Sequence, residues 1–279
     1  MMKYTVVILI VVVAAALSCN KAVEPLVVTT YPFAAGNTWN YKVTYSISNF
    51  RATVPDSTLA DGNYAWTATV TSLGDSLLRD SVHTLRLSAI ENPFPSDGGQ
   101  INHSDKFYLL RNDSLYLYAY SGIYSSVFPK RKPGSMFILN GKKYSDILDL
   151  RNRLAGDLYS VPIANTDTLQ YPSSLSPVYV FPFEKEKEWI VNSQFILVKK
   201  KITGTELITT QAGNFSTFVV QWTYEGISGI DIKEYVNNQG LIKRSISFKD
   251  ITIASAENPE GYGIVDIKNE YEITSLDVH

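Results

Sequence analysis

The stretch WNYKVTYSI at positions 39–47 decides the fold class. Its aromatic and apolar residues occupy every second position: Trp39, Tyr41, Val43, Tyr45. Asn, Lys, Thr and Ser fill the positions between them. A period of two residues is typical of a β-strand with one buried face. We interpret the aromatic side as the core face of the first strand of the fold, and not as a ligand-binding stripe.

Similar alternation recurs along most of the chain, and tyrosines are numerous, with 18 among 279 residues. Aromatic and β-branched residues favour strands. Strand patterns cover 64–70, 81–90, 106–111, 115–120, 195–202, 207–210, 215–224, 230–236, 241–248 and 265–276. Short turns such as Asn112-Asp113 and Asn237-Asn238-Gln239-Gly240 separate them and favour hairpins. We therefore predict a mainly β fold with an antiparallel sheet, as a sandwich or a partly open barrel.

The middle of the chain is less regular. Residues 128–177 contain five prolines, and the one helical pattern, at 144–154, places apolar residues at spacings of three and four. We predict an N-terminal β module at 31–127, an irregular connection or insertion with a short helix at 128–177, and a C-terminal β module at 178–279 that packs with the first.

A short sequence pattern that occurs twice in the chain, which we call the echo, supports this division. Tyr31-Pro32-Phe33 and Phe181-Pro182-Phe183 are each followed, after five residues, by a tryptophan, Trp39 or Trp189. A proline at the start of a strand removes no ladder hydrogen bond. The echo therefore suggests two related β modules that begin near positions 30 and 180.

The N-terminus carries a targeting signal at residues 1–18. Lys3 precedes an uncharged run of 14 residues at 4–17, which is shorter than the ~20 residues that a membrane-spanning helix needs. The only cysteine, Cys19, stands where this run ends. The pattern resembles a bacterial lipoprotein signal, in which cleavage leaves the cysteine as the acylated first residue. An ordinary secretory signal or a free buried cysteine is the alternative.

A lipidated Cys19 fixes the expected location. One acyl chain binds a membrane only marginally, whereas two or more chains anchor a protein stably. Asn20, and not an aspartate, follows the cysteine, which favours the outer membrane. We predict an outer-membrane anchor at the periplasmic face or the cell surface, with 19–30 as the tether.

A net charge of −2 does not indicate the basic surface that proteins use to bind nucleic acid, so we predict no nucleic-acid partner.

Three segments resemble uncharacterised outer-membrane lipoproteins of the Bacteroidota. GNTWNY at 36–41 is similar to their G-N-x-W-x-Y opening. ELITTQAGNF at 206–215, followed by EYV at 234–236 and GLIK at 240–243, resembles the V-x-V-P-A-G-x-F and W-x-x-x-G-x-G-L-V-K segments of the TapB-like group, in the same order. The middle of the chain has no counterpart in this pattern.

The resemblance implies a curved antiparallel sheet of the half-barrel kind found in lipoprotein carriers, and it implies no enzymatic activity. Gln211 stands where the family usually has proline, and Tyr235 where it often has tryptophan. The matched residues have a structural interpretation, since glycine accepts positive φ in tight turns. We assign fold roles to Trp39, Tyr41, Trp189, Gly213, Phe215 and Gly240.

Residues for catalysis or metal binding are scarce. The three histidines, His83, His103 and His279, show no His-x-x-His or His-Glu-x-x-His spacing. The sequence lacks a Gly-x-Ser-x-Gly elbow, a phosphate loop and a dinucleotide fingerprint. A single cysteine excludes an intramolecular disulfide and a thiolate metal cluster. We predict no enzyme activity, no cofactor and no metal.

One aromatic group suggests a ligand site. Alternation at 115–120 places Tyr116, Tyr118 and Tyr120 on one face, with Tyr124 nearby. Tyrosine combines an apolar body with a polar tip, which suits an amphipathic ligand or a sugar. Ordinary cross-strand pairing is the alternative.

Our leading hypothesis is a non-enzymatic lipoprotein that binds an apolar or amphipathic ligand, or an envelope protein, on a concave β face. The alternatives are a structural or assembly subunit of an envelope complex and a surface glycan-binding lipoprotein.

Overall fold

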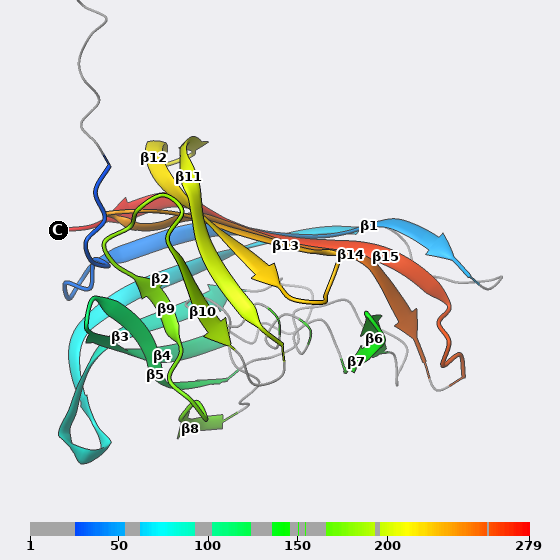
Figure 1. Ribbon diagram of the computed structural model, residues 1–279, viewed down its shortest axis with the longest axis horizontal. Helices are drawn as coiled ribbons and strands as arrows, with labels where there is room; N and C mark the ends of the chain where they lie inside the picture. The colour runs from blue at the N-terminus through cyan, green and yellow to red at the C-terminus, as the bar shows by residue number, and fades with distance from the viewer. Residues whose placement is uncertain are drawn as a thin grey trace, which may run out of the picture.

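The computed structural model describes residues 26–53, 62–92, 102–123, 136–145, 150, 154, 166–192, 196–255 and 257–279. Cys19, Tyr124 and most of the predicted helix at 144–154 lie outside these residues. The described part confirms the fold class, because it forms one curved antiparallel sheet that does not close (Figure 1).

The sheet contains fifteen strands within the described residues. Their bounds are β1 (Thr38–Ala52), β2 (Gly62–Leu78), β3 (Val82–Asn92), β4 (Asn102–Arg111), β5 (Ser114–Ile123), β6 (Met136–Leu139), β7 (Lys142–Tyr144), β8 (Thr166–Gln170), β9 (Pro177–Val180), β10 (Glu188–Asn192), β11 (Val198–Thr210), β12 (Gly213–Tyr224), β13 (Ile230–Asn237), β14 (Gly240–Ala254) and β15 (Gly263–Asp277). A short 3-10 turn, η1 (Arg79–Ser81), joins β2 to β3.

Strand order follows the chain in two runs. The sheet reads β10-β11-β12-β13-β14-β15-β1-β2-β3-β4-β5-β8, and the pairing of β15 with β1 joins the last strand to the first. Three short strands lie off this path, with β9 on β5, β6 on β14, and β7 on β6. The two β-rich regions therefore share one continuous sheet, and their origin as related modules stays a prediction.

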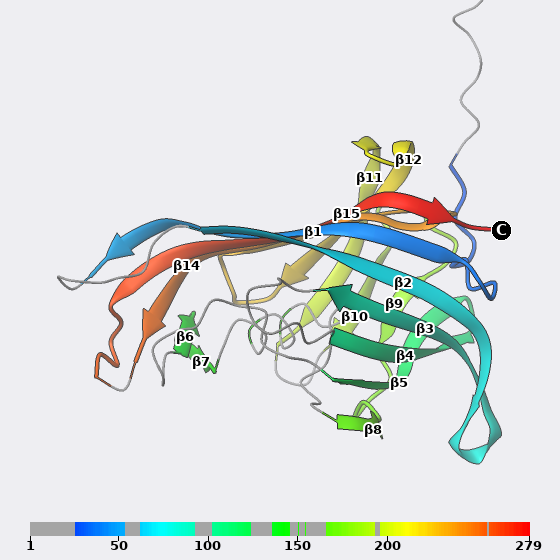
Figure 2. The same cartoon turned by 180° about the vertical axis from the view of Figure 1, so that it is seen from behind.

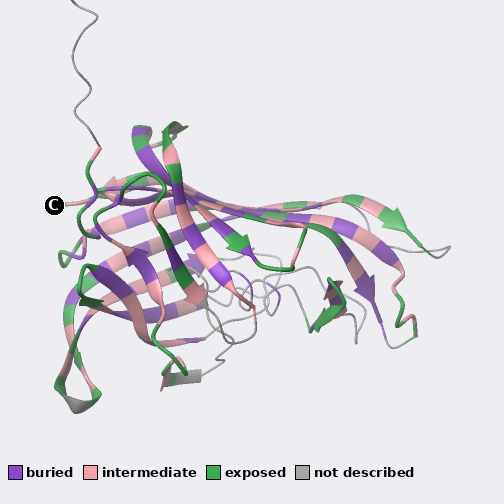
Figure 3. Ribbon diagram, in the orientation of Figure 1, coloured by how far each residue is buried: buried purple, intermediate pink, exposed green. Residues whose placement is uncertain are grey.

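One face of the sheet is buried, and we call it the inner face. In β1 it carries Trp39, Tyr41, Val43, Tyr45 and Ile47, all at most 6% exposed. The alternation of buried and more exposed residues continues along the neighbouring strands (Figure 3). The aromatic residues of the first strand thus belong to the core, as their two-residue period predicts.

The two echoed segments meet at one end of the sheet in a group that we call the aromatic cap: Tyr31, Phe33, Trp39, Tyr108, Tyr179, Phe181, Phe183 and Phe218. The Tyr31 and Tyr179 rings stack with centroids 6.2 Å apart. Phe181 and Phe183, on either side of the cis-proline Pro182, stack at 5.3 Å. Phe183 N–H also donates a 2.9 Å hydrogen bond to the Val28 carbonyl, so the segments before β1 and β10 pack together.

At the other end, β1, β14 and β15 extend beyond the body of the sheet as a long wing (Figures 1 and 2). Both β1 and β14 carry one extra residue relative to β15 there, near Asn49 and Asp250, which have positive φ of 55° and 56°. The Asp266 carboxylate of β15 joins the two bulges, accepting hydrogen bonds from Asn49 Nδ2 at 2.7 Å and from Asp250 N–H at 2.9 Å. Bulges bend and twist strands, so this paired bulge sets the direction of the wing.

Five apolar residues of the middle segment are buried in the same apolar cluster as the inner face of the sheet: Phe137, Leu139, Tyr144, Leu150 and Leu154. Tyr144 ends β7 and so does not begin the predicted helix. Beyond Ser145, only Leu150 and Leu154 of that helix are described, and both are helical. The stretch expected to be irregular also contributes the short strands β6, β7 and β8.

Candidate functional site

The predicted tyrosine stripe is broken by a β-bulge. The register of β4 with β5 pairs Lys106 with Tyr120 and Tyr108 with Leu117, so one extra residue intervenes in β5. Directly paired residues of an antiparallel sheet point to the same face. Tyr120 therefore shares the face of Lys106, whereas Tyr116, opposite Leu109, lies on the other face. The prediction that the tyrosines share one face is wrong, because alternation continues through a strand only where no residue is inserted.

The three described tyrosines are half-buried. The Tyr118 ring meets Tyr171 edge-on, with centroids 5.7 Å apart and planes at 88°. The Arg79 guanidinium lies 5.7 Å from the centre of the Tyr171 ring. Perpendicular rings offer no shared plane on which a sugar could stack. Ligand contact by these tyrosines and by Tyr124, which is outside the described residues, stays a prediction.

A serine, a histidine and an aspartate meet on the outer face of β3 and β4. Ser88 Oγ lies 3.0 Å from His103 Nε2, and Asp105 Oδ1 lies 3.7 Å from the same nitrogen. A catalytic triad needs the serine and the carboxylate on opposite ring nitrogens. Arg86 also binds the Asp105 carboxylate at 2.8 Å. The geometry therefore fits a surface polar cluster and does not match a triad.

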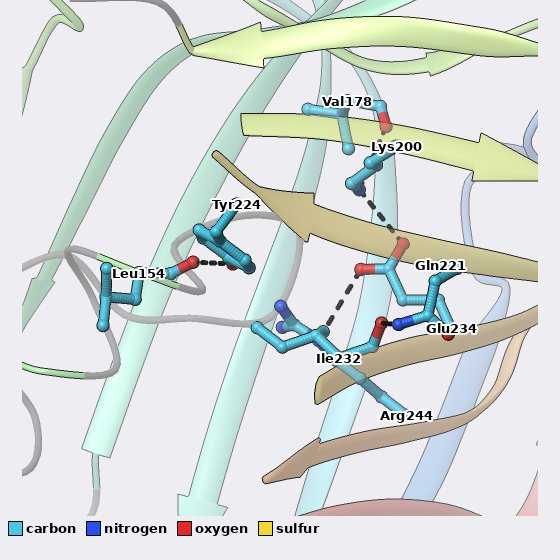
Figure 4. A network of polar contacts seen from close by, with 8 residues as sticks. All are labelled: Leu154, Val178, Lys200, Gln221, Tyr224, Ile232, Glu234 and Arg244. Atoms are coloured by element: carbon cyan, nitrogen blue, oxygen red, sulfur yellow. Dashed lines mark hydrogen bonds and ion pairs between the residues drawn. The ribbon is translucent and has the colours of Figure 1, made fainter. Parts of the chain in front are cut away.

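A buried charged cluster crosses the inner face instead (Figure 4). Lys200, Glu234 and Arg244 are 0%, 1% and 1% exposed. The Lys200 ammonium donates to Glu234 Oε2 at 3.0 Å and to the Val178 carbonyl at 3.1 Å. Arg244 Nε lies 3.6 Å from Glu234 Oε1. One carboxylate is therefore shared by two cations in the interior.

Strand register brings these side chains together. Glu234 of β13 is directly opposite Arg244 of β14, and Lys200 of β11 is opposite Trp222 of β12. The Lys200 ammonium lies 4.2 Å from the centre of the Trp222 ring and 4.7 Å from that of Tyr179. An aromatic face attracts a cation, and more strongly where water is absent.

The polar row continues across the sheet. Arg244 is opposite Tyr271 of β15, whose hydroxyl donates to Glu91 Oε1 at 3.1 Å. Trp66 Nε1 lies 3.4 Å from the other oxygen of Glu91, which is 3% exposed. We call this row the polar belt: Lys200, Glu234, Arg244, Tyr271 and Glu91. The aromatic cap lies on one side of it along the strands, and apolar residues such as Ile246, Phe248 and Ile267 lie on the other.

The sequence contains a pattern that indicates the polar belt, and it is a different pattern from the alternating tyrosines of 115–120. Each of its three charged residues near the cap stands between apolar residues two positions away: Val198 and Ile202 around Lys200, Ile232 and Val236 around Glu234, and Ile242 and Ile246 around Arg244. A charge at an inward position of an alternating strand predicts a buried ionic group. Lys199 and Lys201 instead point outwards and pair with Glu188 and Glu186 at 3.0 Å and 2.5 Å.

Two searches of the described residues bear on other kinds of site. Those residues contain no group of three or more histidine, cysteine, aspartate or glutamate side chains placed to hold a metal ion. Among them there is also no helix of the length and apolarity that crossing a membrane requires.

Comparisons with known proteins add little. No protein-family model matches the chain, and no curated protein matches it. Among solved structures, the chain is similar to a crystal structure of a "putative lipoprotein" from Parabacteroides distasonis ATCC 8503, with 14% identity, 88% of this chain and 97% of that chain covered, and a TM-score of 0.33. Because that TM-score is too low to support an argument, membership of a lipoprotein family stays a prediction.

Proposed function

We propose that this protein is a non-enzymatic envelope lipoprotein that binds an amphipathic molecule on its inner sheet face. The polar belt supports this proposal. It places lysine, glutamate and arginine side chains between two apolar layers, so that an apolar tail and a polar head would each meet matching chemistry. Binding sites for small molecules are mostly apolar, with a few polar groups that fix orientation.

The cost of burying the belt strengthens the argument. Removing a charge from water costs several kcal/mol, and well-packed apolar residues often replace a buried ion pair without loss of stability. Buried ionisable groups also gather at functional sites. Lys200, Glu234 and Arg244 are therefore better explained by ligand recognition than by the stability of the sheet.

The anchor is the second part of the proposal. Acyl chains on Cys19 hold the protein at the outer membrane, and the residues after Cys19 connect them to β1. A Cys19→Ala variant should move from the membrane pellet to the supernatant after lysis and ultracentrifugation. Unchanged pelleting of this variant contradicts the anchor.

Ligand binding can be tested with cis-parinaric acid, a fluorescent fatty acid, titrated into the purified full chain. The proposal expects saturable binding that weakens at least about tenfold, or about 1.4 kcal/mol, in the double variant Lys200→Met/Glu234→Leu. The matched control is Lys243→Met/Glu272→Leu, which removes an outer-face pair whose nitrogen and oxygen are 3.2 Å apart. Equal affinities for the two double variants contradict the role of the belt.

The second candidate function is a structural subunit of an envelope complex. It is favoured by the burial of Leu150 and Leu154 in the same apolar cluster as the inner face, because these residues of the chain itself cover part of the apolar surface. Affinity capture from detergent-solubilised envelopes separates the candidates. A stoichiometric protein partner, together with no saturable cis-parinaric acid binding, supports the structural function.

A further inference from the structure

We propose that the capped end of the fold lies against the lipid bilayer and that Val27, Leu73 and Leu207 contact it. This inference rests on the membrane anchor of the proposed function and adds an orientation to it. Three features carry the argument: the place where the N-terminal segment leaves the fold, the apolar side chains around that place, and the short distance to Cys19.

The N-terminal segment is fastened at both ends before β1 begins. Val28 is buried and accepts the hydrogen bond from Phe183 N–H. Further along, Ser72 N–H donates to the Asn37 carbonyl at 2.8 Å, and Ser72 Oγ donates to the Phe33 carbonyl at 2.7 Å. We call residues 26–37 the strap. Because the strap is held across the aromatic cap, the chain must leave the fold at that end.

Large apolar side chains that are open to solvent surround the strap. Val27, within it, is 58% exposed. Leu73 is 44% exposed and lies between Ser72, which bonds the strap, and Gly74, whose added Cβ would meet Ala35 at 2.9 Å. Single exposed apolar residues are ordinary on a protein surface, but Val27 near the start of the strap and Leu73 beside its end give this one segment two of them.

Leu207 is the third member and is 72% exposed. It belongs to a two-stranded ribbon formed by 203–210 of β11 and 213–217 of β12. The ladder of β12 with β13 stops at Phe218, and that of β11 with β10 stops at Lys201, so the ribbon projects beyond the sheet. In Figure 1 the ribbon and the blue start of the strap rise on the same side of β14 and β15.

A chain of contacts joins the ribbon to the strap. Phe218, at the base of the ribbon, packs edge-on against Phe183 with ring centroids 5.7 Å apart. Phe183 in turn donates to Val28. Leu207 pairs with Ser216, which precedes Phe218 by two residues. Leu207 therefore lies close to the contact between Phe218 and Phe183, the residue that binds the strap.

The bilayer is the occupant that fits this surface. Six residues lie between Cys19 and Leu26, so this stretch spans at most about 25 Å when fully extended. Acyl chains on Cys19 therefore keep the strap close to the lipid head groups. Apolar side chains at a membrane surface sit about 5–10 Å deep, at the boundary of head groups and acyl chains. Val27, Leu73 and Leu207 are placed to do this without opening the core.

The test uses the acylated full chain in vesicles of phosphatidylethanolamine and phosphatidylglycerol. Because Cys19 carries the anchor, a cysteine introduced at Leu207→Cys is the only thiol for an environment-sensitive fluorophore. We expect nitroxide-labelled lipids to quench this fluorophore at least about twofold more strongly than one at Glu260→Cys. Glu260 is an exposed residue between β14 and β15 at the far end of the wing, and it serves as the control. A Leu73→Cys label should behave like the label at position 207.

The outcomes separate the orientation from the anchor. Vesicles that retain the protein while labels at 207 and 73 stay as unquenched as the label at 260 overturn the orientation and leave the anchor intact. Protein that fails to float with the vesicles overturns both. Strong quenching at 207 and 73, with little at 260, supports the bilayer as the occupant of this surface.

Discussion

The indole N–H of Trp39 donates a 2.6 Å hydrogen bond to the carbonyl oxygen of Gln239, 200 positions further along the chain. The next inward residue, Tyr41, donates from its hydroxyl to the Leu241 carbonyl at 2.8 Å. The first strand therefore holds the turn between β13 and β14, which belongs to the other β-rich region. This contact between side chains and a turn supplements the β1–β15 ladder.

Trp39→Phe should lower the free energy of unfolding by about 1–3 kcal/mol beyond the effect of the smaller ring, because it leaves the Gln239 carbonyl without this donor. Chemical unfolding followed by circular dichroism measures the change. Trp189→Phe is the matched control, since the Trp189 indole N–H has no hydrogen-bond partner in the part of the chain that the structure describes. Equal losses in the two variants contradict a role for the hydrogen bond.

Gly240→Ala should destabilise the turn that Trp39 holds. Gly240 has φ +105°, and a Cβ there would lie 3.1 Å from both Trp39 Nε1 and Tyr31 Oη. The conformational strain alone costs about 1–3 kcal/mol. Gly213→Ala, at φ +133° with no atom within 4 Å of its Cβ, has the strain without the crowding. The melting temperature should fall further for Gly240→Ala, and the reverse order contradicts the crowding.

Replacing one member of the buried cluster should lower the free energy of unfolding more than replacing two. Glu234→Gln takes away the carboxylate that Lys200 and Arg244 share, and breaking such a buried pair costs about 3–5 kcal/mol. The double variant Lys200→Met/Glu234→Leu should recover part of this loss in urea unfolding. On the outer face, Glu272→Gln, opposite Lys243, should change stability by only about 0–1 kcal/mol. A mild effect of Glu234→Gln would show that the buried charges are not coupled.

Asp266 should make the stability of the wing depend on pH. Partial burial by itself would raise the pKa of Asp266, but hydrogen bonds from Asn49 and Asp250 and the charges of Arg51 and Lys249 outweigh it and hold the pKa below its ordinary value. A carboxyl with a lowered folded-state pKa stabilises the fold above its unfolded pKa of about 3.9, and this contribution disappears as pH falls through the folded value.

The check is the urea midpoint at about pH 7 and about pH 3 for the wild type and for Asp266→Asn. Other carboxyls titrate in both proteins, so the difference between them isolates Asp266. The wild type should lose more stability on acidification than the variant. Equal losses would contradict a contribution of this carboxylate to the paired bulge.

The sequence predicts the strands best where alternation is unbroken. In β14 the inward apolar residues shift from even positions, Ile246 and Phe248, to odd positions, Ile251 and Ile253, across the bulge at Asp250. The alternation therefore predicts a strand at 241–248, although β14 continues to Ala254. The same kind of inserted residue misled the prediction for the tyrosines of β5.

The candidate site was harder to predict than the fold. The inward positions of Lys200, Glu234 and Arg244 can be found from the alternation of each strand. Their contact depends on the order and register of β11 to β14, which a single strand pattern does not contain. The aromatic cap likewise brings together segments about 150 positions apart, and nothing local in either one specifies the other.

The paired bulge around Asp266 has a consequence for relatives of this chain. The extra residues in β1 and β14 flank a stretch of β15 that has none, so each bends its strand on either side of β15 and the three stay in register beyond it. Deleting only one of them would bend the wing towards one side and remove one partner of the carboxylate. Insertions and deletions near positions 49 and 250 should therefore be inherited together, although 200 residues separate them in the gene product.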